Sequence, residues 1–217
     1  HLGQNENPNG IVLFAPNAAG KSTLLSSLGL SIIMAQSGCF VPANKLEFTP
    51  QDGIFTRINA KDSVGISSFV SEMQQLKNII HRVTHNSLIL SDEACNMTEQ
   101  TSALSISAAT LIYLIEKKAS FMFATHLHTL YEIEDVKNLH PRLLFKNLSV
   151  ELHNDELIYS RKLQDGIGER LYGVKVAKHI LAHDKFWEIA NKIKKDLVND
   201  IIPTKTKYNS RVFKGKC

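Results

Sequence analysis

The stretch from Ile11 to Thr23 constrains this chain more than any other. It begins with four apolar residues suited to a buried parallel strand, continues into a loop of small residues, and opens a helix at Gly20-Lys21-Ser22-Thr23. The letters IVLFAPNAAGKST come close to the pattern G-x-x-x-x-G-K-[ST]. In that pattern, successive backbone N–H groups at a helix N-terminus form a cradle for phosphate. The stretch therefore predicts an α/β fold with a phosphate-binding loop after its first strand.

The residues of this loop indicate separate roles in holding a nucleotide. Lys21 is expected to reach the β- and γ-phosphates, and the Ser22 hydroxyl is expected to ligate Mg²⁺. Ala15 replaces the first glycine, which a small residue can do if its φ stays negative. The alternative is a Gly-Lys-Ser run that caps a helix by chance, and the flanking strand and helix disfavour it. The predicted nucleotide-binding residues are Ala15, Pro16, Asn17, Ala18, Ala19, Gly20, Lys21, Ser22 and Thr23.

Two adjacent carboxylates follow a second short apolar strand, in the run SLILSDE at residues 87–93. Ligands collect at the carboxyl ends of strands in open α/β sheets, so this run resembles a Walker B strand. Asp92 is expected to hold Mg²⁺ through water, and Glu93 to orient or deprotonate the attacking water. Asp-Glu pairs are common in loops, but a phosphate loop upstream makes this pair a strong indication.

Two histidine pairs invite a metal-binding interpretation. His126 and His128 follow the apolar strand at residues 120–124, where a histidine can hydrogen-bond a γ-phosphate. His81 and His85 are four residues apart on an expected amphipathic helix that begins at Ser67 or Ser68. Neither pair has a visible third ligand, so we favour phosphate sensing for His126, no role for His128, and ordinary surface positions for the other two.

Composition limits the remaining possibilities. The 217 residues suit one α/β domain, and no apolar run approaches the roughly 20 residues that cross a bilayer. The net charge of +4 is concentrated after Pro203, where five basic residues and no acidic ones occur, so the preceding body is near neutral and a weak candidate for gripping DNA by itself. Three cysteines without paired spacing indicate a reducing, intracellular compartment. The absence of an initiating methionine indicates a piece of a longer protein.

The coarse pattern predicts an alternation of helices and strands. Helices are expected at residues 23–36, from Ser67 or Ser68 onward, and at 101–119, with a strand at 54–58 and a β-hairpin at 143–164 that turns at Asn154-Asp155. Two short helices, at about 174–181 and after Asp184, form a helix-turn-helix that serves either DNA binding or dimerisation, and we favour dimerisation because its outer first turn has few bases. We expect an ATPase domain over residues 1–172, this helical element over 173–202, and a basic tail over 203–217.

These motifs together resemble the ATPase domain of the MutS mismatch-recognition family. The matching pieces, in order, are APNAAGKST, VPA, DGIFTRI, SSFVSEM, SLILSDE, FATH and QDG…YG. A generic ABC-type ATPase shares the phosphate loop and the Walker B strand but lacks FTRI, FATH and QDG…YG. The resemblance implies a P-loop NTPase fold of the ABC-ATPase type, with a mostly parallel sheet flanked by helices and a C-terminal helix-turn-helix used mainly for dimer contacts.

The resemblance also implies roles, cofactors and partners. ATPase domains of this family dimerise head to tail, and Ser67 would act in trans on the γ-phosphate bound by the partner, which its place at a helix N-terminus favours. Lys21, Glu93, His126 and Ser67 would then be the catalytic residues, Ser22 and Asp92 the metal ligands, and ATP and Mg²⁺ the cofactors. The implied partners are a second MutS-like subunit, forming a homodimer, and mismatched double-stranded DNA bound through domains absent from this chain, with no membrane involved.

The chain departs from the family pattern after Glu93. Where the family usually has G-R-G-T-S-T-Y-D-G, this chain has CNMTEQTSA at residues 95–103, and only Thr98 persists. That loop helps to couple the two nucleotide sites, so coupling and turnover are placed in doubt. The run resembles a MutS subgroup of large DNA viruses and octocoral mitochondria, in which an HNH-type nuclease domain follows, so the nucleus, a virion or viral factory and the mitochondrion all stay open.

The sequence therefore predicts a Mg-ATP hydrolase domain of a DNA mismatch-repair protein, weakly active as an isolated fragment. Two alternatives stay open. One is another ABC-class repair or chromosome ATPase, which should show an LSGGQ-like run that is not found. The other is an ATP-gated dimerisation module with little hydrolysis, which the altered loop favours.

Overall fold

The computed structural model describes most of the chain in two compact units, residues 1–170 and residues 171–217. The described residues are 2–3, 8–16, 19–58, 68–92, 98–153, 156–168, 181 and 184–201. Unit 1 carries the sheet and its covering helices, and the described part of unit 2 is dominated by one helix.

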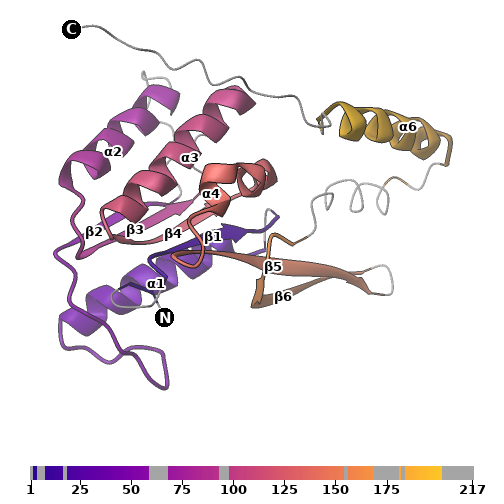
Figure 1. The fold of residues 1–217 in the computed structure, drawn as a ribbon. Coiled ribbons are helices and arrows are strands. Elements are labelled where there is room, and N and C mark those ends of the chain that lie inside the picture. Colours follow the sequence, from indigo (N-terminus) through magenta and orange to yellow (C-terminus); the bar gives the residue numbers. More distant parts are fainter. Residues whose placement is uncertain are drawn as a thin grey trace, which may run out of the picture. The chain divides into compact units, whose positions relative to one another are not determined.

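Unit 1 is built on a six-stranded sheet with the strand order β2-β3-β4-β1-β5-β6 (Figure 1). The strands are β1 (Gly10–Phe14), β2 (Gly53–Arg57), β3 (Ser87–Asp92), β4 (Ser120–Thr125), β5 (Leu143–His153) and β6 (Glu156–Asp165). All neighbouring pairs are parallel except β5 and β6, which form an antiparallel hairpin. The predicted α/β class with a mostly parallel sheet is confirmed.

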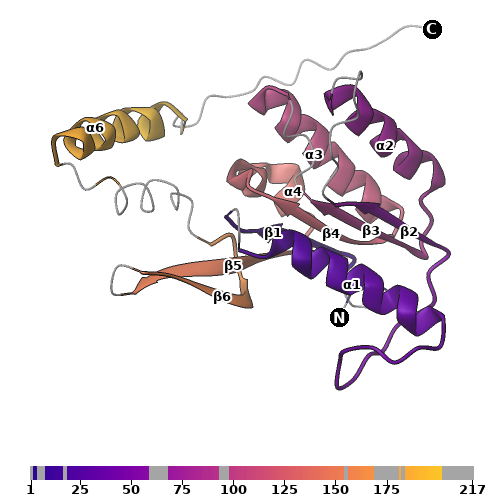
Figure 2. The same ribbon diagram turned by 180° about the vertical axis from the view of Figure 1, so that it is seen from behind.

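Helices cover both faces of the parallel strands (Figures 1 and 2). Helix α1 packs on one face, and α2, α3 and the short α4 lie over the other. Their bounds are α1 (Lys21–Gln36), α2 (Ser68–Arg82), α3 (Gln100–Glu116), the 3₁₀ turn η1 (His128–Glu132), and α4 (Glu134–Lys137). Unit 2 contains α6 (Asp184–Ile201). This two-sided cover explains why β1 is buried along its whole length.

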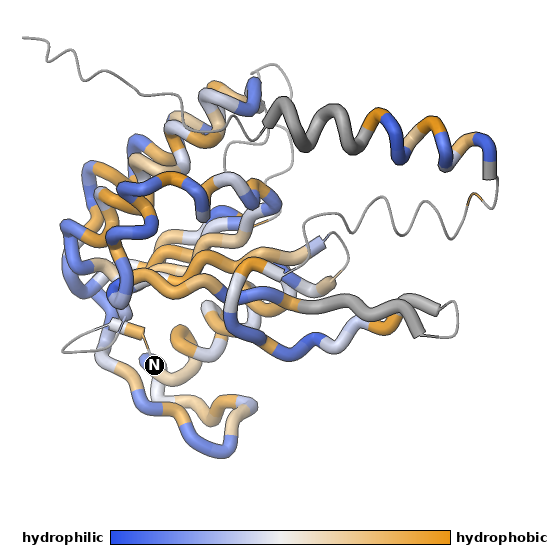
Figure 3. The backbone as a smooth tube through the Cα atoms, turned by 45° about the vertical axis from the view of Figure 1, so that its right-hand side comes forward, coloured by the Kyte–Doolittle hydropathy of each residue, from blue (hydrophilic) through white to orange (hydrophobic). Residues whose placement is uncertain are grey.

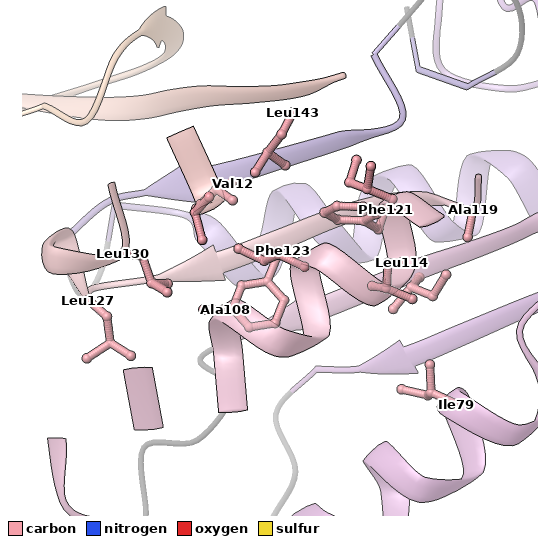
Figure 4. Close-up of a cluster of buried hydrophobic side chains, with 14 of the residues drawn as sticks. Val12, Ile79, Ala108, Leu114, Ala119, Phe121, Phe123, Leu127, Leu130 and Leu143 are labelled. Atoms are coloured by element: carbon pink, nitrogen blue, oxygen red, sulfur yellow. The ribbon is translucent and has the colours of Figure 1, made fainter. Parts of the chain in front are cut away.

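The two faces of the sheet carry separate hydrophobic clusters. On the α1 face, Leu13 and Leu90 pack with Leu25. On the other face, Phe121 and Phe123 of β4 lie beside α3, and Figure 4 shows them with Leu114 and Ala108. Burying one such side chain fully stabilises the fold by about 1.5–3 kcal/mol, so β4 is an anchor of unit 1. Figure 3 shows the same pattern in the central strands, which are mostly hydrophobic.

Some element boundaries differ from those that the sequence predicts. Helix α3 ends at Glu116 rather than at Ala119, because Lys118 takes φ 57° and leaves the right-handed helical region. Helix α1 begins at Lys21, two residues before the predicted start. The hairpin turn at 154–155 and nearly all of the expected helix at 174–181 lie outside the described residues. Over the part of the chain that the structure describes, no helix is long and apolar enough to cross a bilayer.

Candidate functional site

The carboxyl ends of β3, β4 and β1 lie next to one another at one edge of the sheet. In the parallel pairing of β1 with β4, Phe14 is opposite Thr125. In the pairing of β3 with β4, Asp92 is opposite Ala124. The residues that follow these strands therefore emerge at the same edge, where ligands of open α/β sheets bind.

The loop after β1 folds tightly around the start of α1. The Lys21 side chain, 5% exposed, turns back so that its Nζ donates to the Ala15 carbonyl at 2.9 Å and to the Pro16 carbonyl at 3.3 Å. Gly20 precedes the helix with φ 100°, a conformation that side chains rarely adopt. The loop thus encloses an ammonium group next to a helix N-terminus, where the first N–H groups have no carbonyl partner within the helix, and such an arrangement binds anions.

Ala15 fits its position despite replacing a glycine of the pattern. Among the described residues other than glycine, only Lys118 and Arg161 have positive φ values, so Ala15 meets the condition stated for it. Its side chain is 6% exposed and belongs to the α1-face cluster. Of the other predicted loop residues, Thr23 is exposed, and Asn17 and Ala18 lie outside the described part.

Ser22 and Asp92 meet although they are 70 residues apart in the chain. The Ser22 Oγ donates a hydrogen bond to Asp92 Oδ2. The second carboxylate oxygen, Asp92 Oδ1, is buried and has no hydrogen-bond partner within the described part of the chain. A hydroxyl and a carboxylate with an unused buried oxygen are the hard oxygen donors that Mg²⁺ prefers. The residues present therefore fit the predicted magnesium site.

The turn after β4 brings a third group to this edge. Thr125 is fully buried, and its Oγ1 accepts the Leu127 N–H at 3.0 Å. The His128 N–H donates to the His126 carbonyl at 2.9 Å, while the His126 side chain is exposed. His126 is therefore an exposed imidazole on a hydrogen-bonded turn beside the loop.

Two predicted catalytic residues, Ser67 and Glu93, lie outside the described residues. Each directly adjoins a described one: Glu93 follows Asp92 at the end of β3, and Ser67 precedes the first residue of α2. Their roles stay predictions. The structure thus brings Lys21, Ser22, Asp92 and His126 to one edge of the sheet.

The expected helical pairing of His81 and His85 is wrong. Helix α2 ends at Arg82, so His85 lies in the turn beyond it, and both side chains are exposed. No cluster of three or more metal-ligating side chains occurs among the residues that the structure describes. His81 and His85 thus lie at the surface, as expected.

Sequence reasoning missed a buried ion pair beside the site. Arg57 Nη2, at the end of β2, lies 2.6 Å from Glu72 Oε1 on α2, and the two side chains are only 12% and 3% exposed. The only hint in the sequence is a glutamate beside the apolar stripe of α2, next to Met73. Its partner is on another element, which periodicity cannot reveal.

Comparison with known proteins places these features in a family. The model of MutS domain V matches residues 11–198. A putative DNA mismatch repair protein mutS homolog of Acanthamoeba polyphaga mimivirus is 39% identical over 219 residues, which cover 96% of this chain and 20% of that relative. A mitochondrial DNA mismatch repair protein mutS homolog of Sarcophyton glaucum is 38% identical over the same length, covering 96% and 22%.

A bacterial relative agrees with this assignment. The DNA mismatch repair protein MutS of Desulfatibacillum aliphaticivorans is 41% identical over 173 residues, which cover 77% of this chain and 19% of that protein. The chain thus spans about a fifth of the length of the curated relatives it matches. The ordered motifs, the parallel sheet and the family match agree, and the chain belongs to the MutS family, with residues 11–198 corresponding to MutS domain V.

Proposed function

We propose that this chain is the Mg-ATP-hydrolysing domain of a MutS-like DNA mismatch-repair protein, with a P-loop fold of the ABC-ATPase type. The observation that carries the proposal is the contact between Ser22 and Asp92, with the buried Asp92 Oδ1 left available, directly beside the enclosed Lys21 ammonium. MutS family proteins are ATPases, and this constellation is what nucleotide binding at such a loop requires.

Binding would use the loop from Ala15 to Thr23. Its backbone N–H groups and the start of α1 would hold the phosphates, and Lys21 would exchange its carbonyl contacts for the β- and γ-phosphate oxygens. Ser22 and Asp92 would hold Mg²⁺, which when bound neutralises charge on the phosphate chain. These residues supply binding and orientation rather than covalent chemistry.

Hydrolysis would need groups at the ends of β3 and β4 and one from a second subunit. Glu93 would orient the attacking water or accept its proton, and His126 would donate a hydrogen bond to the γ-phosphate. Ser67 of the partner subunit would add a donor to the same phosphate from the start of a helix. Since one donor comes from the partner, the isolated chain would be a weak enzyme.

Helix α6 supports the dimer in this proposal. Its apolar side chains Phe186, Ile189 and Ile193 recur at helical spacing and are each about half exposed, at 49%, 55% and 52%. Within unit 2, Trp187 Nε1 donates to the Leu181 carbonyl at 2.8 Å, which joins the helix to the segment before it. We propose that the element over 173–202 makes dimer contacts, that 203–217 is a basic linker, and that mismatched DNA is bound through other parts of a longer protein.

Removing the Lys21 ammonium group tests Mg-ATP binding. Lys21→Ala should abolish measurable Mg-ATP binding in calorimetry, because the buried ammonium is the main positive charge of the described loop. The matched control is Lys45→Ala, since Lys45 is a surface lysine whose side chain is 74% exposed and pairs with the exposed Glu47. Unchanged Mg-ATP affinity in Lys21→Ala would show that the loop is misinterpreted.

Concentration dependence tests the composite site. Steady-state ATPase activity per molecule should rise with protein concentration over the range in which dimers form, because each site needs Ser67 of the partner subunit. A constant specific activity across that range would contradict catalysis in trans. Single-turnover hydrolysis separates a working ATPase from a module that only binds ATP and dimerises, and no hydrolysis in a single turnover would favour the latter.

A further inference from the structure

Four aromatic rings in successive contact hold the turn η1 against strands β1 and β5. The His128 ring stacks on Phe14 with centroids 5.0 Å apart and planes 17° apart. Phe14 lies 6.2 Å from Phe145 of β5, and Phe145 meets Tyr131 edge-on at 5.0 Å. His128 and Tyr131 both belong to η1, so this one turn is held at two points, one on β1 and one near β5.

The link between β4 and η1 contains only His126 and Leu127. Thr125 anchors its start through the bond from the Leu127 N–H to Oγ1, and the His128 N–H closes the turn on the His126 carbonyl. Leu127 is 8% exposed and belongs to the same core cluster as Leu130, and both are labelled in Figure 4. The backbone of His126 is thus fixed on both sides while its imidazole faces solvent.

The stacked pair also adjoins the phosphate loop along the chain. Phe14 is fully buried and directly precedes Ala15, whose carbonyl accepts the Lys21 ammonium. In the pairing of β1 with β4, Phe14 is opposite Thr125, the residue before His126. One ring contact therefore ties the turn that carries His126 to the strand end that carries the loop.

We propose that His128 is a positioning residue, which holds His126 in register with the γ-phosphate through its stack on Phe14. This rests on the proposed function, in which the loop binds ATP and His126 contacts the γ-phosphate. The role requires the flat ring of His128, because the contact with Phe14 is a stack of nearly parallel rings. His128 therefore affects how the site distinguishes ATP from ADP, which lacks the γ-phosphate, without touching the nucleotide.

The test compares His126→Ala, His128→Ala, His128→Phe and the double alanine variant in the 217-residue chain. For each variant, calorimetry gives the dissociation constants of Mg-ADP and of a slowly hydrolysed Mg-ATP analogue, and thermal unfolding checks the fold. The measured quantity is the preference for the ATP analogue over ADP. Mg-ADP affinity serves as the internal control, since ADP does not reach His126.

Each variant has an expected effect on the preference for the ATP analogue over ADP. His126→Ala lowers the preference about tenfold, the size of one hydrogen bond to a charged phosphate. His128→Ala lowers it by roughly two- to tenfold, which is the range of one aromatic contact, with Mg-ADP affinity unchanged. His128→Phe keeps the stack and the preference. The double variant matches His126→Ala alone, because His128 acts through His126.

Other results overturn the inference. If His128→Ala weakens both nucleotides equally, or still lowers the preference in the His126→Ala background, then His128 is only a packing residue. If His126→Ala leaves the preference unchanged, then the inference fails, while nucleotide binding that depends on Lys21 would keep the rest of the proposed function. If His128→Ala does not fold, then Phe14→Leu removes the same stack from the other side and must lower the preference.

Discussion

Replacing Arg57 by methionine, Glu72 by methionine, and both together measures what the buried ion pair contributes to unit 1. The guanidinium and carboxylate are 2.6 Å apart, and they line a cavity of about 20 Å³ whose other walls are mostly apolar side chains. Removing one partner of a buried pair costs about 3–5 kcal/mol, because the other charge keeps its burial and loses its attraction. Replacing both with apolar groups of similar volume is about neutral or stabilising.

The two single variants should differ in a direction that burial determines. The Glu72 side chain is 3% exposed and that of Arg57 is 12% exposed. Arg57→Met leaves the more deeply buried charge behind, whereas in Glu72→Met the long arginine can extend its charged end toward water. We therefore expect Arg57→Met to lower the free energy of unfolding more than Glu72→Met, and the double variant to be more stable than either one.

Urea unfolding followed by far-ultraviolet circular dichroism is the suitable assay. The chain's single tryptophan, Trp187, lies in unit 2, so its fluorescence would report on the wrong unit. The matched control is the same cycle on the pair of Lys45 and Glu47, which has the same 2.6 Å separation but exposures of 74% and 63%. Its coupling should stay below about 1 kcal/mol. Additive losses in the double Arg57/Glu72 variant would refute the reasoning.

Two further predictions concern packing and pH. Gly10→Ala should destabilise unit 1 by about 1–3 kcal/mol in thermal unfolding, because a Cβ there would lie 2.1 Å from the Cζ of the buried Phe121 ring. An unchanged melting temperature would show that β1 and β4 move apart to admit the added methyl group at no cost in stability. Hydrogen bonds from Ser102 and then Thr98 hold the pKa of Glu99 below its ordinary value of 4.5. The folded-state pKa is the lower one, so the resulting stabilisation is present above pH 4.5 and is lost as the pH falls through the folded-state value. In an NMR titration, Ser102→Ala should raise this pKa, and no change would contradict the assigned cause.

Much of the fold follows from local pattern. Apolar runs placed β1 and β3 because strands covered on both faces need continuous apolar residues. The apolar stripe through Phe69, Met73 and Leu76 predicted α2 by its spacing. Helix ends were less accurate, since the left-handed turn at Lys118 that ends α3 has no glycine to mark it.

The site was predictable where its chemistry depends on individual residues at motif positions. Lys21, Ser22, Asp92 and His126 are motif positions, and parallel topology brings the ends of their strands to one edge. The contacts that fix them are tertiary. The stack of His128 on Phe14 joins the turn η1 to strand β1, and no spacing rule reveals it. For the same reason His128 received no role from the sequence.

The magnesium dependence of ATP binding tests the central claim most directly. Calorimetry on the wild-type chain and on Asp92→Asn, with and without Mg²⁺, isolates the carboxylate that the Ser22 hydroxyl contacts. We predict that Mg²⁺ tightens ATP binding in the wild type and that this gain disappears in Asp92→Asn, while affinity without Mg²⁺ is at least retained. The same magnesium gain in both proteins would contradict the assignment of Asp92 and Ser22 as the metal-binding pair.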